Sequence, residues 1–450
     1  MLLITRWDWF LINFFFRAGR DLSHVQTVGG SARRSRDSNG IPAFLRKAMT
    51  APSQRAIWNA LDLLVDLGAM HPETNELTPL GDCLSVLSVE PRVGKMVIWS
   101  YILGCARVAS NMACGMSSKS PFVMPHPEEK FAAQNAMVEL SQNSESDPIT
   151  IHHVLEEQER WGKSGFNDFC RSNYLSIPSM KTIADSRRGL KRELSSLGFP
   201  SPSIPNMYQN RHDEDNGLWT AAIAAGLYPN VAFRTQAENK FSTISRQKGK
   251  AQNKSVNSAM GPLSMTHAEN NFSTMSRQKV KAHSNSVNSA KGQPLSTTCM
   301  VPDDELELMC YGEMVKGDWT FTVSQTTLLA SPLPLLLLCG KSLTVRPQAG
   351  NESMSILNLD DIIAYKCDAE TAGHVAILRK RLESAFWHAI SNRSHGLSTL
   401  TAEERDAVDI VGTVLQSAHQ TAPIRNRDVT SAQYEWEHNN SSGGQSRRPR

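Results

Sequence analysis

The chain has 450 residues and contains 47 lysines and arginines against 44 aspartates and glutamates, so its formal net charge is only +3. At about 150 residues per domain, this length predicts two to four domains. The balanced charge excludes a histone-like basic tail and a strongly acidic chaperone. A local basic stripe can be hidden in a neutral total, so nucleic-acid binding stays open.

The cysteines and the N-terminal residues indicate the compartment. The eight cysteines form no Cys-x-x-Cys pair, which argues against a zinc module or a disulfide framework and favours buried free thiols in a reducing compartment. Arg6 and Asp8 interrupt the apolar run at residues 1–16, so a signal peptide or membrane anchor is the less favoured interpretation. We therefore expect an intracellular protein with no membrane partner, and leave nucleus and cytoplasm open.

The region that follows predicts a small α/β unit. Ser53 is a plausible N-cap for a helix that ends at Gly68, a hairpin follows over residues 69–77, and Thr78-Pro79 begins another helix. With an earlier helix from Ile41, this order of elements is typical of a winged helix.

Residues 91–233 are predicted to be mostly helical, because apolar residues recur there at helical spacing. Leu218 to Leu227 is apolar throughout and predicts a buried helix. His152 and His153 near Glu156 offer metal-ligand chemistry, but a metal site would need partners from elsewhere. A solvated helix end is the favoured interpretation of the two histidines.

A tandem repeat with a period of about 31 residues fills residues 237–296. Ala237 to Thr243 recurs as Ala268 to Thr274, and most of the positions that follow are also identical. Two copies rich in Ser, Asn and Lys cannot bury a solenoid core, so a local duplication with one copy as an insertion is expected. The segment holds nine Lys or Arg against two Glu. That composition suits phosphate contacts, with a solvated basic loop as the alternative.

The C-terminal third predicts strands and then helices. Short apolar runs between residues 306 and 365 fit a small antiparallel barrel, in which Leu333 to Leu338 is expected to be a buried strand. Helices are predicted over residues 369–390 and 402–417.

Catalytic motifs are missing from the sequence. Gly340-Lys341-Ser342 suggests a phosphate loop, but Leu335 stands where the Walker pattern needs glycine, and neither a DExH nor a Gly-x-Ser-x-Gly string occurs. We expect no catalytic residue, no metal site and no cofactor in this chain. ATP and Mg²⁺ are expected only if motor domains are supplied.

Several strings of the chain occur in an order that one protein family shares. They are Ile57 to Gly68, Leu77 to Gly81, Val89 to Met96, Ser120 to Phe122, Phe169 to Leu175, Ile183 to Arg188, Ala224 to Ala232 and Ser331 to Gly340. Together they resemble the C-terminal region of DEAH/RHA-type ATP-dependent RNA helicases, without the two RecA-like motor domains. The resemblance covers roughly residues 41–365.

The resemblance implies a mainly α fold with a β-barrel: a winged helix and a helical ratchet bundle, then an OB-like barrel and C-terminal helices. The expected divisions are a disordered N-terminus (1–40), the winged helix (41–90), the helicase-associated ratchet domain (91–233), a duplicated basic insertion (234–300), the OB-like barrel (301–367), C-terminal helices (368–420) and a disordered tail (421–450).

The family carries a His-Pro-Ser-Ser-Val-Asn loop that faces RNA. Residues 283–288 are similar, although Ser284 and Asn285 replace Pro-Ser, which removes the rigidity that proline gives. The upstream copy of the repeat has lost the histidine. The expected RNA contacts are Arg187, Arg188, His283, Ser286 and Asn288.

Three functions follow from these observations. The leading hypothesis is an RNA-binding accessory module that grips single-stranded RNA backbone and has no ATPase motor of its own. The second is a fragment of a complete ATP-dependent RNA helicase, which an in-frame Walker motif upstream of Met1 would establish. The third is a scaffold for helicase motor domains or a protein activator, which would bind proteins after nuclease treatment but not RNA.

Overall fold

The computed structural model describes residues 53–74, 76–202, 208–234, 241–244, 279–289, 307–317, 321–348, 350–393 and 400–420. The expected helix at residues 41–49 and both terminal segments lie outside these ranges. None of the helices in these ranges combines the length and apolar character that crossing a membrane requires.

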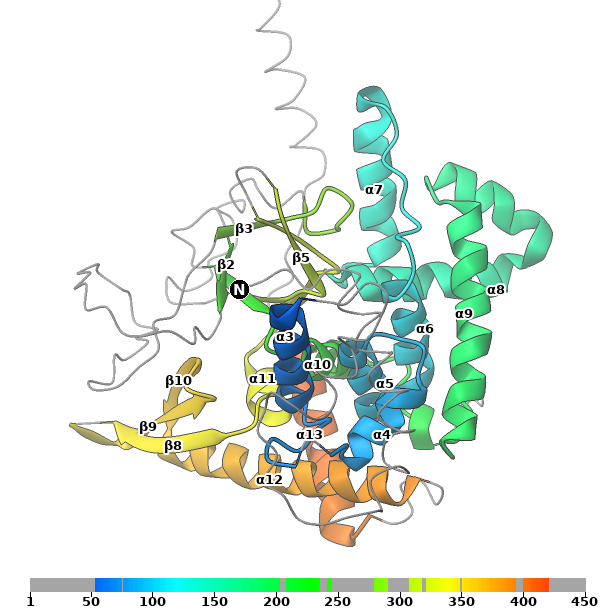
Figure 1. Cartoon of the computed structure of the whole chain (residues 1–450). Coiled ribbons are helices and arrows are strands. Elements are labelled where there is room, and N and C mark those ends of the chain that lie inside the picture. Colours follow the sequence, from blue (N-terminus) through cyan, green and yellow to red (C-terminus); the bar gives the residue numbers. More distant parts are fainter. Residues whose placement is uncertain are drawn as a thin grey trace, which may run out of the picture.

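The described helices include a continuous helical region and two C-terminal helices, as predicted. They are α3 (Gln54–Asp66), α4 (Pro79–Val86), α5 (Pro91–Leu103), α6 (Ala106–Met116), α7 (Lys130–Ser141), α8 (Asp147–Ser172), α9 (Ile177–Ser196), α10 (Asn216–Leu227), α11 (Leu333–Leu338), α12 (Ala369–Ser391) and α13 (Ala402–Gln420). In Figure 1, α8 and α9 stand at one side of the molecule, while α12 runs beneath the small sheet at the other.

The N-terminal elements follow the predicted start signals. The Ser53 hydroxyl accepts a hydrogen bond from the Ala56 amide at 3.2 Å and caps α3. Thr78 caps α4 in the same way, and its hydroxyl also donates to the Gly68 carbonyl at 2.7 Å. An antiparallel bridge between Met70 and Leu77 closes the predicted hairpin. The winged helix as a whole stays a prediction.

The core is built around α10. Every residue of this helix from Gly217 to Leu227 is buried, as the apolar run predicted, and the helix packs against α5, α11 and α13. At Gly226 an added Cβ would lie 2.6 Å from the Arg92 carbonyl oxygen, so only glycine permits this approach of α10 to α5. α10 therefore connects the helical region with the C-terminal helices.

The described strands form two sheets. They are β1 (Val231–Arg234), β2 (Phe241–Ile244), β3 (Lys279–Ala282), β4 (Glu307–Cys310), β5 (Glu313–Lys316), β6 (Phe321–Ser324), β7 (Thr327–Leu329), β8 (Leu343–Gln348), β9 (Asn351–Leu359) and β10 (Ile363–Asp368). The larger sheet has the order β5-β6-β3-β2-β1-β4-β7, and the smaller one is β10-β9-β8. Among the strands that the structure describes, β3 and β6 are the one parallel pair.

The barrel prediction is confirmed only as the presence of small sheets. β5 and β7 stand at the two ends of the larger order, and no closed barrel is formed by the strands that the structure describes. This sheet draws strands from residues 231 to 329, on both sides of the expected boundary at 300. β8, β9 and β10 form a separate antiparallel sheet that packs on α12.

The prediction of a strand at Leu333 to Leu338 is wrong, because these residues form helix α11. Leucine has no β-branch, and a short apolar run has no periodicity that separates a buried strand from a buried helix. Pro334 decides the outcome: it fits the first turn of a helix, whereas in a central strand it would remove a ladder hydrogen bond.

Candidate nucleic-acid interface

The family-like loop begins where β3 ends. The His283 amide donates to the Val323 carbonyl at 2.7 Å and continues the pairing of β3 with β6. The Asn285 amide donates to Nδ1 of His283 at 3.1 Å, which fixes the imidazole on the turn. Lys281, His283 and Ser284 are exposed and Asn285 is half-buried, so this end of the loop presents cationic and polar groups to solvent.

The second half of the loop is buried. Ser286 is 1 % exposed and Asn288 is 4 % exposed. The Asn288 side-chain amide donates to the Glu145 carbonyl at 3.0 Å and to the Thr326 hydroxyl at 2.9 Å. The hydroxyls of Ser286 and Thr326 lie 2.7 Å apart. The structure therefore places Ser286 and Asn288 in an anchoring position beneath the loop rather than on its surface.

Asp147, the first residue of α8, holds this anchor. Its Oδ1 accepts from the Val287 amide at 2.8 Å, and its Oδ2 accepts from the Thr326 amide at 2.8 Å and the Thr326 hydroxyl at 3.1 Å. Burial raises the pKa of the Asp147 carboxyl, and the hydrogen bonds from Thr326, Val287 and Ser286 oppose that rise. One carboxylate therefore connects α8, the loop and the turn before β7.

The start of α8 also pairs directly with β7. Ser146 and Thr327 form an antiparallel bridge, and their hydroxyls lie 2.7 Å apart. The Leu328 amide donates to the Glu145 carbonyl at 3.1 Å, and the Asp147 amide donates to the Thr326 carbonyl at 2.9 Å. The helical region and the larger sheet are thus joined by backbone hydrogen bonds at this point.

The two predicted arginines lie on α9. Arg187 is half-buried, with Nη2 at 2.6 Å from Glu159 on α8 and Nη1 at 3.4 Å from Oδ1 of Asn111 on α6. Arg188 is exposed and pairs with Asp185, one turn earlier on the same helix. Arg187 is therefore held in place by two other helices, whereas Arg188 extends into solvent.

α9 begins beside the loop, but the arginines lie further along it. Phe122 bridges to Leu175 just before α9, and the Asn285 side chain donates to the Phe122 carbonyl at 3.4 Å. At 1.5 Å per residue, Arg187 is about 15 Å along the helix from its first residue. The structure brings Ser286 and Asn288 together below His283, and it places the two arginines on a separate part of the surface.

The favoured interpretation of His152 and His153 is wrong, because both side chains are buried in the helical core. The Asn111 amide nitrogen lies 3.1 Å from Nδ1 of His152, and burial lowers the pKa of His152 well below its usual value. Asn111 therefore supports both His152 and Arg187. No cluster of metal-ligand side chains occurs in the described ranges.

Comparison with known proteins identifies the helical region. Residues 90–168 match the family described as "Helicase associated domain (HA2), ratchet-like". The family resemblance is confirmed for this region. The matched segment includes α5 to most of α8, and hence Asp147, Glu145 and Phe122.

Similar helicases match less than half of the chain, and the chain covers less than a quarter of their own length. Over 219 residues it is 35% identical to the DExH-box ATP-dependent RNA helicase DExH1 of Arabidopsis thaliana, covering 48% of this chain and 22% of that protein. Over 197 residues it is 33% identical to the human ATP-dependent DNA/RNA helicase DHX36, covering 43% and 19%. The same identity over 197 residues relates it to the mouse ATP-dependent RNA helicase DHX29, covering 42% and 14%.

Asp147 and Thr326, which connect the ratchet-like region to the loop, were not found by sequence reasoning. Ser146-Asp147-Pro148 is a helix-start signal, and it accounts for the cap that Ser146 places on the Ile149 amide at 3.4 Å. The Asp147 carboxylate, in contrast, binds the amides of Val287 and Thr326, which follow it in the chain by 140 and 179 positions. Local sequence carries no signal for such a contact.

The Gly340-Lys341-Ser342 loop is already occupied by a carboxylate of the chain itself. The Lys341 and Ser342 amides donate to Oδ1 of Asp360 at 2.8 and 2.7 Å. Lys341 Nζ lies 2.8 Å from Asp66 on α3. The motif therefore makes a turn between α11 and β8, in agreement with the rejection of a phosphate loop.

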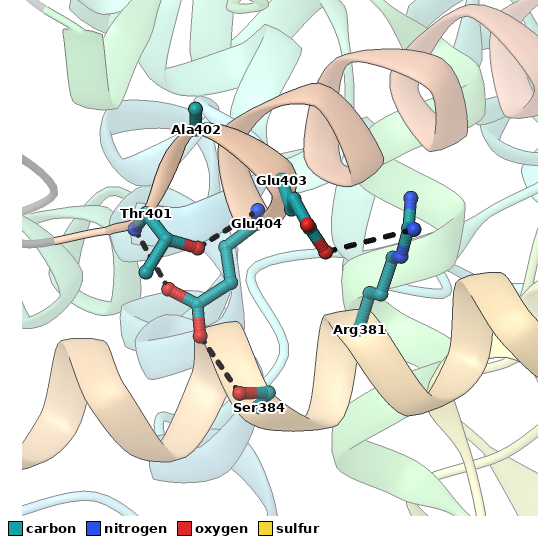
Figure 2. A pocket seen from close by; sticks show the side chains of 6 residues that line it. All are labelled: Arg381, Ser384, Thr401, Ala402, Glu403 and Glu404. Atoms are coloured by element: carbon teal, nitrogen blue, oxygen red, sulfur yellow. Dashed lines mark hydrogen bonds and ion pairs between the residues drawn. The ribbon is translucent and has the colours of Figure 1, made fainter.

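A pocket between α12 and α13 is lined by residues of a capping arrangement (Figure 2). Glu404 accepts from the Thr401 amide at 2.9 Å and from the Ser384 hydroxyl at 2.7 Å, while the Glu404 amide donates back to Thr401 at 3.2 Å. Glu403 and Arg381 pair at its exposed side. This reciprocal pattern is a capping box that begins α13 and attaches it to α12.

Proposed function

We propose that this chain is an RNA-binding accessory module of the helicase-associated type that grips single-stranded RNA through its backbone. The observation that carries the proposal is the loop at residues 283–288, whose exposed half projects from an anchor on the ratchet-like region. The similar proteins are RNA helicases by name, which supports RNA as the ligand class.

The expected RNA-binding residues fall into an exposed group that can meet RNA and a buried group that holds the loop. His283, Ser284 and Lys281 supply a cation and hydroxyl or imidazole donors on the surface, and such groups suit phosphate oxygens. Arg188 supplies an exposed guanidinium, and Arg187 is fixed by Glu159 and Asn111. We assign Ser286 and Asn288 to holding the loop, since their polar side-chain atoms already bond within the protein.

Titration of a labelled, mixed-sequence single-stranded RNA, followed by fluorescence anisotropy over a series of salt concentrations, tests the proposal. The logarithm of the affinity should fall with the logarithm of salt concentration by about 0.7 for each phosphate neutralised. Arg188→Ala should weaken binding several-fold and reduce this slope by about one contact.

Arg171→Ala is the matched control for Arg188→Ala. Arg171 pairs with Asp168 three residues earlier, and both arginine side chains are 75% exposed. The control variant should bind RNA as the unchanged protein does. Salt-independent binding, no binding at low ionic strength, or equal losses in the two variants would refute the proposal.

ATP-dependent unwinding is a second proposal, favoured by the names of the relatives. The matched regions span 14% to 22% of those proteins, so their activity as whole proteins is carried over only as a hypothesis. Because this sequence contains no Walker or DExH motif, a strand-displacement assay with ATP tests it on a protein in which the chain follows helicase motor domains. Displacement that is lost when this chain is removed would support the proposal, and displacement that does not change would refute it.

A further inference from the structure

The carboxylate of Asp147 has two different segments bonded to its two oxygens. Oδ1 binds the amide of Val287 in the loop, and Oδ2 binds the amide of Thr326 before β7. Asp147 is 8 % exposed, and its partners Val287 and Thr326 are also buried. A buried acceptor that satisfies backbone amides from two segments fixes their relative position.

These hydrogen bonds form a connected network. The Thr326 hydroxyl lies 3.1 Å from Oδ2 of Asp147, accepts from the Asn288 side-chain amide at 2.9 Å, and shares a hydrogen bond at 2.7 Å with the Ser286 hydroxyl, in which either oxygen can be the donor. The Asn288 amide in turn donates to the Ser286 hydroxyl at 3.1 Å. Every polar side chain beneath the loop is thus oriented, directly or through Thr326, by one carboxylate.

We infer that Asp147 is a positioning residue for RNA binding: through Val287 and Thr326 it sets the orientation in which His283 to Asn285 meet the RNA. This inference rests on the proposed function. It adds a residue outside the loop, on the first turn of α8, to those that determine RNA affinity. It also gives a physical reason for the loop to keep a fixed shape without the proline of the family pattern.

Asparagine at position 147 would have the shape of aspartate but only one acceptor oxygen. Its single carbonyl oxygen can accept from one of the two amides, and its NH2 group must then face the other donor. Asp147→Asn should therefore release one side of the loop while leaving the size of the side chain unchanged. A buried donor facing a donor is the most costly outcome for such a network.

Asp215 offers a matched control at the start of α10. Its Oδ1 accepts from both the Gly217 and the Leu218 amides, at 2.9 and 3.4 Å. An asparagine there keeps the one oxygen that both bonds use. Asp215 is buried like Asp147, so Asp215→Asn controls for the loss of a buried charge at a helix start.

The test combines amide hydrogen exchange with the RNA titration on the full chain. In Asp147→Asn, exchange at Val287 and Thr326 should accelerate at least tenfold, and RNA affinity should fall at least fivefold at a temperature where the variant is fully folded. Asp215→Asn should change neither quantity. Asn288→Ala gives the same test from the loop side if Asp147→Asn does not fold.

The outcomes separate this inference from the proposed function. Faster exchange with unchanged RNA affinity, or unchanged exchange, overturns the positioning role while RNA binding stands. Equal effects of the two aspartate variants also overturn it, because they would indicate a general loss of stability. If the unchanged protein binds no RNA, the proposed function fails and the inference fails with it, whatever the exchange rates show.

Discussion

Nη2 of Arg379 donates a hydrogen bond to the carbonyl oxygen of Gly340 at 2.9 Å. The same guanidinium donates from Nη1 to the carbonyls of Leu336, at 2.9 Å, and Cys339. These oxygens belong to the C-terminal end of α11 and the turn after it, where the helix has no partners of its own. A buried arginine on α12 thus completes a helix that the sequence predicted to be a strand.

Arg379→Ala should destabilise the protein by about 3 kcal/mol, because it leaves buried carbonyl groups without donors. Arg379→Lys should recover only part of this loss, since one ammonium cannot reproduce the planar spread of a guanidinium. Chemical denaturation measures both. Arg381→Ala, on the exposed side of α12, should stay within about 0.5 kcal/mol of the unchanged protein, and an equal effect of the two alanines would contradict this account.

Position 340 requires glycine both because of its positive φ and because Asp360 lies close to it. Gly350 has a positive φ without a close neighbour, so a comparison of the two positions separates these effects. Gly340 has φ +77° and an added Cβ would lie 2.7 Å from Oδ2 of Asp360, whereas Gly350 has φ +81° with nothing within 4 Å. Gly350→Ala should cost about 1 kcal/mol through backbone strain alone. Gly340→Ala should cost at least about 2 kcal/mol, through strain and the displaced carboxylate. Equal decreases in melting temperature for Gly340→Ala and Gly350→Ala would mean that the contact between position 340 and Asp360 does not affect stability.

The capping box at Glu404 should make stability depend on pH. Burial acts to raise the pKa of Glu404, but hydrogen bonds from Ser384, Thr401 and His388 bring it below its usual value. A lowered pKa in the folded state stabilises above the unfolded pKa, and this stabilisation is lost as pH falls through the folded pKa. Glu404→Ala should therefore cost about 2 kcal/mol at pH 7 and less below about pH 4.

Glu403→Ala is the control for that comparison. Its side chain is 78% exposed and lies 3.6 Å from Arg381, so its loss should be within about 0.5 kcal/mol at any pH. Melting temperatures of both variants across pH 3.5 to 7 decide the question. A cost for Glu404→Ala that stays constant over this range would contradict the capping account.

The tandem repeat contributes one strand from each copy. β2 comes from the first copy and β3 from the second, and they pair with Phe241 opposite Val280. Deleting residues 245–275, one whole period, would join Ile244 to Ser276 and leave three residues, 276–278, between β2 and β3. We predict that this variant folds with unchanged stability and RNA affinity.

Deleting residues 268–298 removes the same length but keeps the first copy. Gly249 then takes the place of Val280, which is 1 % exposed in the core of the sheet, and Gln252 takes the place of His283. This variant should lose about 2 kcal/mol through the missing valine and should also lose RNA affinity. If the two deletion variants were equally stable, either copy of the repeat could supply strand β3 equally well, and the prediction would be wrong.

Sequence predicted the local parts of this fold better than its long-range contacts. The cap at Ser53, the helix start at Thr78-Pro79, the buried α10 and both C-terminal helices are encoded by neighbours in the chain, and the structure confirms them. α11 was missed because a run of leucines fits either a buried strand or a buried helix. Pro334 was the local signal for a helix start, whereas the contact with Arg379 is too far along the chain to be predicted.

The sequence predicted where the candidate RNA-binding loop lies, but not which of its residues face solvent and which hold it in place. The family resemblance located residues 283–288, but exposure divides them into a surface half and an anchor, which no sequence pattern indicates. His152 and His153 show the same limit, because their neighbouring glutamates suggested a solvated helix while Asn111 and Trp219 pack against them from other helices.

Ultraviolet crosslinking of labelled single-stranded RNA to the full chain, with the modified peptides mapped by mass spectrometry, tests most directly where RNA binds. We expect adducts, removed by unlabelled RNA, on the peptide that contains residues 281–285 and on the α9 peptide that contains Arg187 and Arg188. Adducts confined to other surfaces, such as α12 and α13, or no adducts under conditions where a known RNA-binding protein crosslinks, would contradict this expectation.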